Sequence, residues 1–504
     1  MPLSLALGPE LRGKFTGGGA APTPQSKWTG GGSTNNFSDA ANWNVAPIAG
    51  SDLIFAGTTR LTPNNDMSAG TVFGGITFDN TAGAFVIGGN SIANLMSIVN
   101  NSSNSQQLNF PMTITGNLQV DTETQDIKVT NVISGVGRVT KSGPSYTLHL
   151  YSTNTYSGGT HLDEGEIKAY TDNVLGSGVL ATADATTLSS GGGSDNRFDC
   201  NVVLTGTLNI TCYFGGGGDY GFYGVVSGSG LINIIADGNG RRVAFHNTNT
   251  WTGGITSGVG NQYQRGTIEV YKEKGFGTGP ISWNQNGGEI HILNGAGYYT
   301  LANNFITPSG AILAFYINAA TFDINGTISG AGALTMYGSG TVNVLGDVTV
   351  SGTITTPSNG LQVAFNGAST LGPVVNSSLA FQAAGTVASM VNTAPVNPSY
   401  ISPGIDSLAN VGTIAVTGSL SFDSGCTLSL GTNGSTTHSK MTAGGAVTLG
   451  GVTVSFDGAL NAGTYTVISS TGAMTGTVVQ GTAPTGRTWV SLTVVGSDLV
   501  AVVA

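Results

Sequence analysis

The sequence repeats one short phrase three times: Ile-Ser-Gly-Val-Gly at 133–137, Val-Ser-Gly-Ser-Gly at 226–230 and Ile-Ser-Gly-Ala-Gly at 328–332. The first glycines of successive copies are 93 and then 102 residues apart. Each copy follows one run of alternating apolar residues and leads into another. Self-similarity of this kind is typical of a stacked β architecture, in which each unit buries its apolar face on its neighbours. The phrase therefore predicts a β-solenoid.

Two further phrases follow the first in the same order. Asn-Thr-Tyr-Ser-Gly-Gly-Thr at 154–160 corresponds to Asn-Thr-Trp-Thr-Gly-Gly-Ile at 249–255, and Leu-Gly-Ser-Gly at 175–178 corresponds to Phe-Gly-Thr-Gly at 276–279. A coil of β-helix takes about 20–25 residues, so each long repeat would hold about four coils. The phrases predict turns and corners at twelve residues: Gly135, Gly137, Tyr156, Gly158, Gly159, Gly228, Gly230, Trp251, Gly253, Gly254, Gly330 and Gly332.

The two aromatic residues of the second phrase have two interpretations. Tyr156 and Trp251 each stand just before a Gly-Gly bend, where they would stack inside the coil or cap a corner. The alternative is a platform on which a sugar stacks.

Composition supports an all-β chain. Of 504 residues, 80 are glycine, only 8% are charged and 39% are hydrophobic, which differs from the low hydrophobicity and high charge of disordered chains. The glycines show no period of three, so collagen is excluded. The Thr, Ser, Asn, Val and Ile that remain favour strands joined by tight turns. No long segment has helical periodicity.

Charge limits the partners that the chain can bind. The net charge is −10 and the pI about 4.8, whereas nucleic-acid binding needs a basic patch that the pair Arg241-Arg242 does not supply. No run of ~18 apolar residues predicts a spanning helix, so we expect no membrane insertion. Residues 1–10 make a poor secretory signal, and we expect the chain to reach its site of action without one.

Composition also divides the chain into four parts. Residues 1–27 are a Gly/Pro/Ala-rich leader that would be flexible or would dock on another protein. Residues 28–116 are expected to form an N-terminal β region or cap, and 117–400 the solenoid repeats. A proline cluster then precedes 401–504, which we expect to be a β-rich assembly or cap domain, either the end of the solenoid or a small sandwich.

The phrases resemble the autotransporter-associated β-strand repeat of bacterial surface proteins. The segments that carry the resemblance are Gly135–Gly137, Val139–Gly143, Asn154–Thr160 and Leu175–Gly178, with a looser match over 225–279 and similar flanking regions at Trp28–Asn90 and Ser402–Gly404. The resemblance implies a right-handed parallel β-helix and a surface location, and it implies no catalytic residues. A complete autotransporter also has a signal peptide and a C-terminal membrane barrel, and we expect neither in this chain.

The sequence contains partial matches to catalytic motifs, but none of them is complete. Gly8-x-x-x-x-Gly13-Lys14 matches most of a phosphate-binding loop, but Phe15 replaces the magnesium-binding hydroxyl. The acidic group Asp163-Glu164-Gly165-Glu166 reads as a solvated corner rather than a glycosidase dyad. The run Asp121, Glu123 and Asp126 is equally ordinary. We expect no catalytic residue and no enzyme activity, although a site assembled between coils or subunits would leave no trace in the sequence.

Metal and disulfide sites are not predicted either. His149 and His161 could meet on adjacent strands as a metal pair, with separate, satisfied histidines as the alternative. Cys200 and Cys212 lie in neighbouring strand-like segments, where they could face each other or be small core residues, and Cys426 lies apart. The cysteine spacing does not match a zinc site, and we expect no metal and no cofactor.

The favoured function is a non-enzymatic structural protein of a phage particle: a head or tail fibre or spike for display and host attachment. We expect a homotrimer on the virion surface that docks on virion proteins through residues 1–27 and binds a host surface glycan or protein. The alternative is a bacterial cell-surface adhesin or surface-layer β-helix, and a weaker one is a spike depolymerase that degrades polysaccharide.

Overall fold

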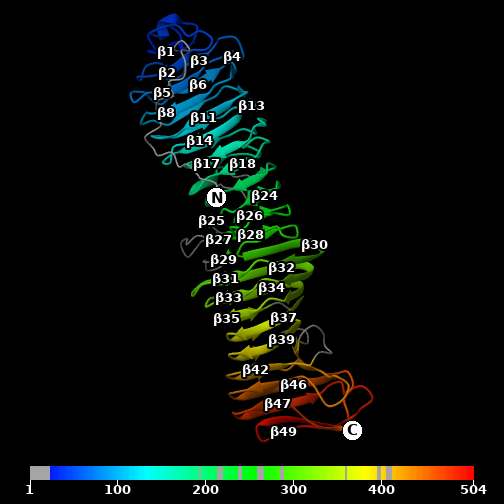
Figure 1. Ribbon diagram of the computed structural model, residues 1–504. Coiled ribbons are helices and arrows are strands. Elements are labelled where there is room, and N and C mark those ends of the chain that lie inside the picture. Colours follow the sequence, from blue (N-terminus) through cyan, green and yellow to red (C-terminus); the bar gives the residue numbers. More distant parts are fainter. Residues whose placement is uncertain are drawn as a thin grey trace, which may run out of the picture.

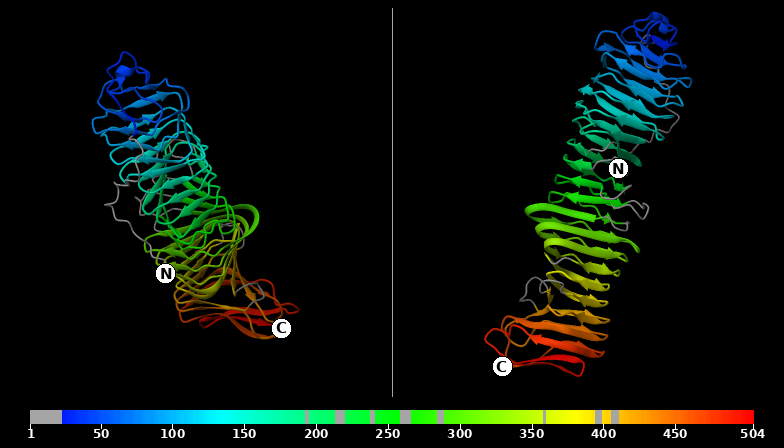
Figure 2. Two further views of the ribbon diagram at one scale, coloured as in Figure 1. Left: turned by 45° about the horizontal axis from the view of Figure 1, so that its top comes forward. Right: turned by 180° about the vertical axis from the view of Figure 1, so that it is seen from behind.

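The protein is a long β-solenoid in the computed structural model (Figure 1). The structure describes residues 23–191, 195–212, 220–236, 241–257, 266–283, 289–357, 360–393, 399–404 and 411–504. Across them the chain winds through about 17 coils, and the N-terminal and C-terminal coils lie at opposite ends of the rod (Figures 1 and 2). Apart from the short 3-10 helix η2 (Ala40–Asn42), the described residues form strands, bridges, bends and turns.

The N-terminal half has three columns of strands, each running along the rod. The first column is a ten-stranded sheet: β1 (Gln25–Trp28), β2 (Asp52–Phe55), β5 (Gly75–Phe78), β8 (Ser97–Asn100), β11 (Asn117–Asp121), β14 (Arg138–Ser142), β16 (Thr160–Leu162), β18 (Leu180–Thr182), β21 (Val202–Leu204) and β24 (Val226–Gly228). The second column contains β4 (Thr71–Val72), β7 (Ile92–Ala93), β10 (Met112–Ile114) and β13 (Ile133–Gly135).

The third column continues into the second half of the chain. It contains β3 (Asn64–Asn65), β6 (Val86–Gly89), β9 (Gln106–Leu108), β12 (Ile127–Val129), β15 (Thr147–Leu150), β17 (Glu166–Ala169), β19 (Thr186–Ser190), β22 (Leu208–Cys212), β25 (Ile232–Ala236), β27 (Ile255–Ser257), β29 (Ile281–Ser282), β31 (Phe305–Thr307), β33 (Ile328–Gly330) and β35 (Val348–Val350).

A further column begins with β20 and contains the longest strands of the middle of the rod. It runs through β20 (Asn196–Phe198), β23 (Tyr220–Phe222), β26 (Arg241–Phe245), β28 (Gly266–Val270), β30 (Glu289–Leu301), β32 (Ile312–Ile324), β34 (Ala333–Val344) and β37 (Gly360–Leu371).

The C-terminal coils add the remaining strands. These are β36 (Ile354–Thr356), β38 (Val374–Asn376), β39 (Ala380–Val387), β40 (Met390–Asn392), β41 (Ser399–Pro403), β42 (Thr413–Val416), β43 (Leu420–Phe422), β44 (Cys426–Gly431), β45 (Lys440–Ala443), β46 (Val447–Asp457), β47 (Gly463–Ser470), β48 (Met474–Gln480), β49 (Trp489–Val495) and β50 (Asp498–Val503).

Strand pairing shows the length of a coil. Along β14, β16, β18, β21 and β24 the register partners lie 20 to 24 residues apart in the sequence. This spacing confirms the coil length expected from the sequence. The parallel ladder continues across the expected divisions near 116 and 400, because β11 pairs with both β8 and β14, and β41 pairs with both β39 and β44.

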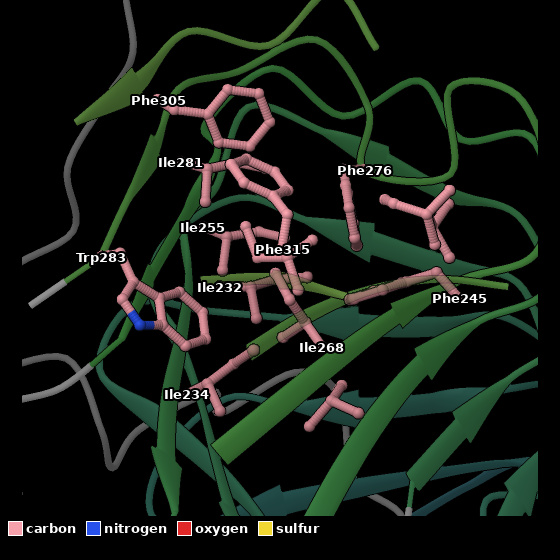
Figure 3. Close-up of a cluster of buried hydrophobic side chains, with 14 of the residues drawn as sticks. Ile232, Ile234, Phe245, Ile255, Ile268, Phe276, Ile281, Trp283, Phe305 and Phe315 are labelled. Carbon is pink, nitrogen blue, oxygen red and sulfur yellow. The ribbon is translucent and has the colours of Figure 1, made fainter. Parts of the chain in front are cut away.

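On most short strands, such as β2, β8 and β15, buried side chains alternate with more exposed ones, and the buried ones stack from coil to coil. Figure 3 shows this core where Ile232, Ile255, Ile281 and Phe305 extend it across four successive coils. The buried apolar residues form one continuous cluster from Trp28 to Val503. Period-two alternation with one buried face is what the apolar pattern of the sequence predicts.

The two ends of the described rod are built differently from its middle. At the N-terminal end Trp28, Phe37, Trp43 and Phe55 pack ring to ring, with Trp28 and Trp43 edge to face at 5.0 Å. At the other end β50 pairs antiparallel with both β47 and β49, whereas all other pairings between the described named strands are parallel. The C-terminal end of the described rod therefore closes with antiparallel pairings.

Candidate functional site

The first glycine of each repeated phrase has a backbone conformation that favours glycine. Gly135, Gly228 and Gly330 have φ of +105°, +102° and +128°. Each ends a short strand, β13, β24 or β33. A Cβ at Gly228 would lie 2.1 Å from the carbonyl oxygen of Leu204 one coil earlier, so both backbone and space require glycine there. The expected corner geometry at these three positions follows from this requirement.

Other glycines of the phrases form columns in which one coil lies directly on the next. A Cβ added to Gly137 would be 2.3 Å from the oxygen of Gly116, and one added to Gly158 would be 2.5 Å from the oxygen of Gly137. A second column has the same contacts, with 2.2 Å between Gly230 and Gly206 and 2.1 Å between Gly253 and Gly230. These glycines are needed because adjacent coils are too close for any side chain.

Of the remaining predicted corner glycines, Gly159 and Gly254 combine both constraints, whereas Gly332 is limited by space alone. Gly159 and Gly254 have φ of +90° and +85°, and a Cβ at either would be within 2.5 Å of a carbonyl oxygen on the following coil. At Gly332 a Cβ would be 2.2 Å from the hydroxyl of Thr307.

Both predicted corner aromatics are core residues. Tyr156 and Trp251 are fully buried, so neither leaves a ring face on which a sugar could stack. The hydroxyl of Tyr156 is 2.6 Å from that of Thr160, which donates to the carbonyl oxygen of Leu175. The indole nitrogen of Trp251 donates to the carbonyl oxygen of Gly254 at 3.3 Å. The aromatic residue therefore holds its bend from inside the coil.

Lys141 is a corner residue that the sequence analysis did not single out. Its side chain is fully buried, and its ammonium donates to the carbonyl oxygens of Ser142, Gly143 and Glu164 at 2.7–3.1 Å. Burial lowers the pKa of Lys141 to about 8, against the attraction of Asp121 and Glu164. The lysine thus donates hydrogen bonds to backbone carbonyl groups that are buried at the corner and have no access to water.

The acidic groups considered for catalysis lie at this same corner. Asp163 to Gly165 form the turn between β16 and β17, with Gly165 at φ +73°. A carboxylate oxygen of Glu164 accepts a hydrogen bond from the amide of Gly143 at 3.1 Å, and Glu166 accepts from Thr147 and Ser189. These contacts tie the acids to the backbone and to neighbouring hydroxyls.

The two histidines considered as a metal pair belong to different columns. His149 lies on β15, where its ring contacts Asp126 and Tyr170, whereas His161 lies on β16 beside Arg138. They are not register partners, so the metal-pair interpretation is excluded and the two histidines are separate. Among the residues that the structure describes, no group of three His, Cys, Asp or Glu side chains could hold a metal ion, and no helix is long and apolar enough to span a membrane.

Two of the three cysteines are buried free thiols, Cys200 and Cys426. Burial raises the pKa of each to about 11. The side chain of Cys212 lies outside the described residues, as do residues 1–22, which contain the phosphate-loop-like segment and most of the expected docking leader.

An outward ladder of stacked rings crosses the middle coils. The guanidinium of Arg197 lies 4.0 Å from the ring centroid of Tyr223. The ring of His246 stacks between Tyr223 and Tyr271, with centroid distances of 3.9 Å and 4.1 Å. Gly221 and Ala244 leave a hollow of about 170 Å³ beside this ladder. Hydrogen bonds from His291 and Tyr271 hold the pKa of the buried Glu269 below its usual value, although burial alone would raise it. Each ring of this ladder has at least one face covered by a neighbouring ring.

Side chains of the C-terminal coils line a larger hollow. The ribbon of these coils is yellow to orange in Figure 1. The volume of the hollow is about 690 Å³, within the range of ligand sites. We call it the C-terminal groove. Its lining residues are Gln362, Leu379, Ala380, Phe381, Gln382, Tyr400, Ser402, Thr427, Ser429, Thr453, Ser455, Phe456, Asp457, Gly481 and Thr482. They come from β37, β39, β41, β44 and β46 and from the segment after β48, so no contiguous motif marks them in the sequence.

Comparison with known proteins gives one weak likeness. No family model and no solved structure matches the chain. A curated relative is the adhesin BmaC autotransporter of Brucella suis biovar 1 (strain 1330), 26% identical over 156 residues. The aligned part is 28% of this chain and only 4% of the adhesin. Together with the stacked coils, this likeness fits a β-helix surface protein and favours the surface-adhesin alternative over a phage fibre.

Proposed function

We propose that the chain is a non-enzymatic β-solenoid adhesin displayed on a bacterial cell surface. The observation that carries the proposal is the unbroken stack of parallel coils, whose outward side chains form a long surface and two hollows. The partial likeness to an autotransporter adhesin supports it. A stack of coils in which each coil contacts only its neighbours suits display, because it holds a binding surface away from its attachment point.

A binding role rather than catalysis is supported by the state of the acidic groups. The carboxylates of Glu164 and Glu166 accept hydrogen bonds from the corner backbone and from hydroxyls, an arrangement that stabilises a turn. We expect no release of reducing sugar ends when the chain is incubated with capsular polysaccharide or lipopolysaccharide. Steady release would contradict a purely adhesive role.

Location is the sharpest test of the proposal. Antibodies against the purified chain should label intact, unpermeabilised cells of the source bacterium. Beads coated with the full chain should adhere to host cells, and soluble chain should compete with them. Antigen that bands only with phage particles in a density gradient would overturn the proposal in favour of a virion fibre.

The mass of the purified chain is a second discriminator. A surface solenoid that folds alone should be a monomer by light scattering, whereas a phage fibre should be a homotrimer. The homotrimer and the docking of residues 1–27 on virion proteins remain predictions of the virion alternative.

A further inference from the structure

The C-terminal groove crosses five coils. Register pairing aligns Gln362 with Ala380, Ala380 with Tyr400, Tyr400 with Thr427 and Thr427 with Thr453. Successive strands lie about 4.8 Å apart, so this row of outward residues is roughly 19 Å long. The groove therefore suits an elongated ligand that lies along the rod.

Short side chains create the hollow between taller ones. Ala380, Ser402 and Ser429 line its floor, and Ser402 and Ser429 are 5% and 6% exposed. The longer side chains of Gln362 and Tyr400 stand on the same face. On a flat strand face an outward depression exists only where small residues fall next to one another in successive coils, which is what the register produces here.

Tyr400 offers a free aromatic face. It is 42% exposed, and in the described part of the chain no other aromatic ring stacks on it. In the ladder of Tyr223, His246 and Tyr271, by contrast, each ring covers its neighbour. An exposed ring beside a polar groove suits a ligand with one apolar face and a polar rim.

The rest of the lining offers hydrogen bonds and almost no charge. Thr427, Thr453 and Ser455 bring hydroxyl groups, which both donate and accept. Asp457 is the one charged residue among the described lining residues, and it accepts from the hydroxyl of Ser429 at 3.4 Å. No lysine or arginine lines the described groove, so it lacks the groups that recognise carboxylate, sulfate or phosphate.

We propose that the C-terminal groove binds a neutral oligosaccharide. A pyranose ring stacks its C–H face on Tyr400, and its hydroxyl groups exchange hydrogen bonds with the Ser, Thr and Gln side chains. Asp457 and the net charge of −10 disfavour uronic acids, sialic acids and phosphorylated sugars. This inference rests on the proposed adhesive function and names the class of its ligand.

The test uses the purified full chain on a printed array of neutral and acidic oligosaccharides. Maltohexaose, cellohexaose, laminarihexaose and hexagalacturonate then serve as soluble probes in saturation-transfer NMR and titration calorimetry. We expect retention of neutral glycans and no binding of hexagalacturonate. Retention of acidic glycans alone, or of none, would overturn the proposal.

Variants locate the binding on the groove. Tyr400→Ala should weaken binding of the retained glycan about tenfold or more, because it removes the stacking face. Tyr400→Phe keeps that face and should stay within about threefold of the parent chain. Thr427→Gln fills the middle of the groove and should also abolish binding.

The matched control is Tyr316→Ala. Tyr316 is another outward tyrosine on a long strand, β32, and it does not line the groove. This variant should bind the glycan like the parent chain. Circular dichroism and light scattering establish that each variant is folded. Equal weakening in Tyr316→Ala and Tyr400→Ala, or full binding by Tyr400→Ala and Thr427→Gln, would reject the groove.

Failure of this inference differs from failure of the proposed function. If coated beads adhere to cells and Tyr400→Ala beads adhere equally well, the groove is rejected and the adhesin remains. If the chain is absent from the cell surface, the proposed function is rejected, whatever the array retains.

Discussion

The column of Gly116, Gly137 and Gly158 gives a sharp prediction about what holds the coils together. In the Gly158→Ala variant the new methyl group would lie 2.5 Å from the carbonyl oxygen of Gly137, about 1 Å too close. The same oxygen accepts a hydrogen bond from the amide of Gly158 at 3.0 Å. Relieving the clash therefore means lengthening and losing that bond.

The magnitude follows from these contacts. Overpacking costs about 1–3 kcal/mol and the lost hydrogen bond about 1 kcal/mol. Alanine returns about 0.5–1 kcal/mol by restricting the unfolded chain. The net loss is roughly 1–3.5 kcal/mol, and Gly137→Ala should behave in the same way, since its methyl group would lie 2.3 Å from the oxygen of Gly116.

Hydrogen exchange is the appropriate assay, because a stack of coils need not unfold in one step. Amides of 133–160 should exchange roughly 5- to 400-fold faster in both variants, and amides of 447–470 should not change. Gly116→Ala is the matched control, since a Cβ there meets nothing within 4 Å. If Gly137→Ala and Gly158→Ala exchange like Gly116→Ala, coil contact does not explain the glycine column.

Three further predictions concern buried polar groups. The pKa of Lys141 is about 8 in the folded chain and near its ordinary 10.5 in the unfolded chain. Because the unfolded chain binds more protons between these values, the free energy of unfolding should rise from pH 8 to pH 9.5. Urea titrations should show this rise in the parent chain and not in Lys141→Met. The Tyr156→Phe variant should lose about 1 kcal/mol of stability in thermal or urea unfolding, because Thr160 loses its hydroxyl partner. Cys200 and Cys426 should resist iodoacetamide at pH 8 in the folded chain and react quickly in urea, since both thiols are buried with raised pKa.

Each of these has an outcome that contradicts it. An identical pH dependence in the parent chain and Lys141→Met would mean that another group titrates. A fully stable Tyr156→Phe would show that the hydroxyl does not hold the bend. Fast alkylation under native conditions would show that the coils around the thiols open readily.

The solenoid could be predicted from the sequence because its corners have a local cause. Gly135 and Gly228 are fixed by backbone conformation and by close approach of neighbouring coils, so only glycine serves and the phrase recurs. The length of a coil was expected from β-helices in general, and the register partners 20 to 24 residues apart agree with it. The role of Lys141 was missed even though its segment was part of the resemblance, because burial of an ammonium group depends on carbonyls that the fold gathers from Ser142, Gly143 and Glu164.

The C-terminal groove could not be predicted. Ala380, Tyr400 and Thr427 are unremarkable in the sequence, and they become neighbours only through register between coils. Register likewise separates His149 from His161, which are close in sequence but belong to different columns. Period-two alternation shows which residues point outward, but not which lie side by side on adjacent coils.

The pairing of strands between coils has a mechanical consequence. The coils are stacked along the rod (Figure 2), and strands of successive coils pair with each other, so a pull along the rod loads every coil in series with the same tension. Coils should then peel away one at a time, each releasing about 20 residues of extended chain. An adhesin whose coils unfold in such steps would dissipate the energy of shear flow before its bond to the ligand breaks.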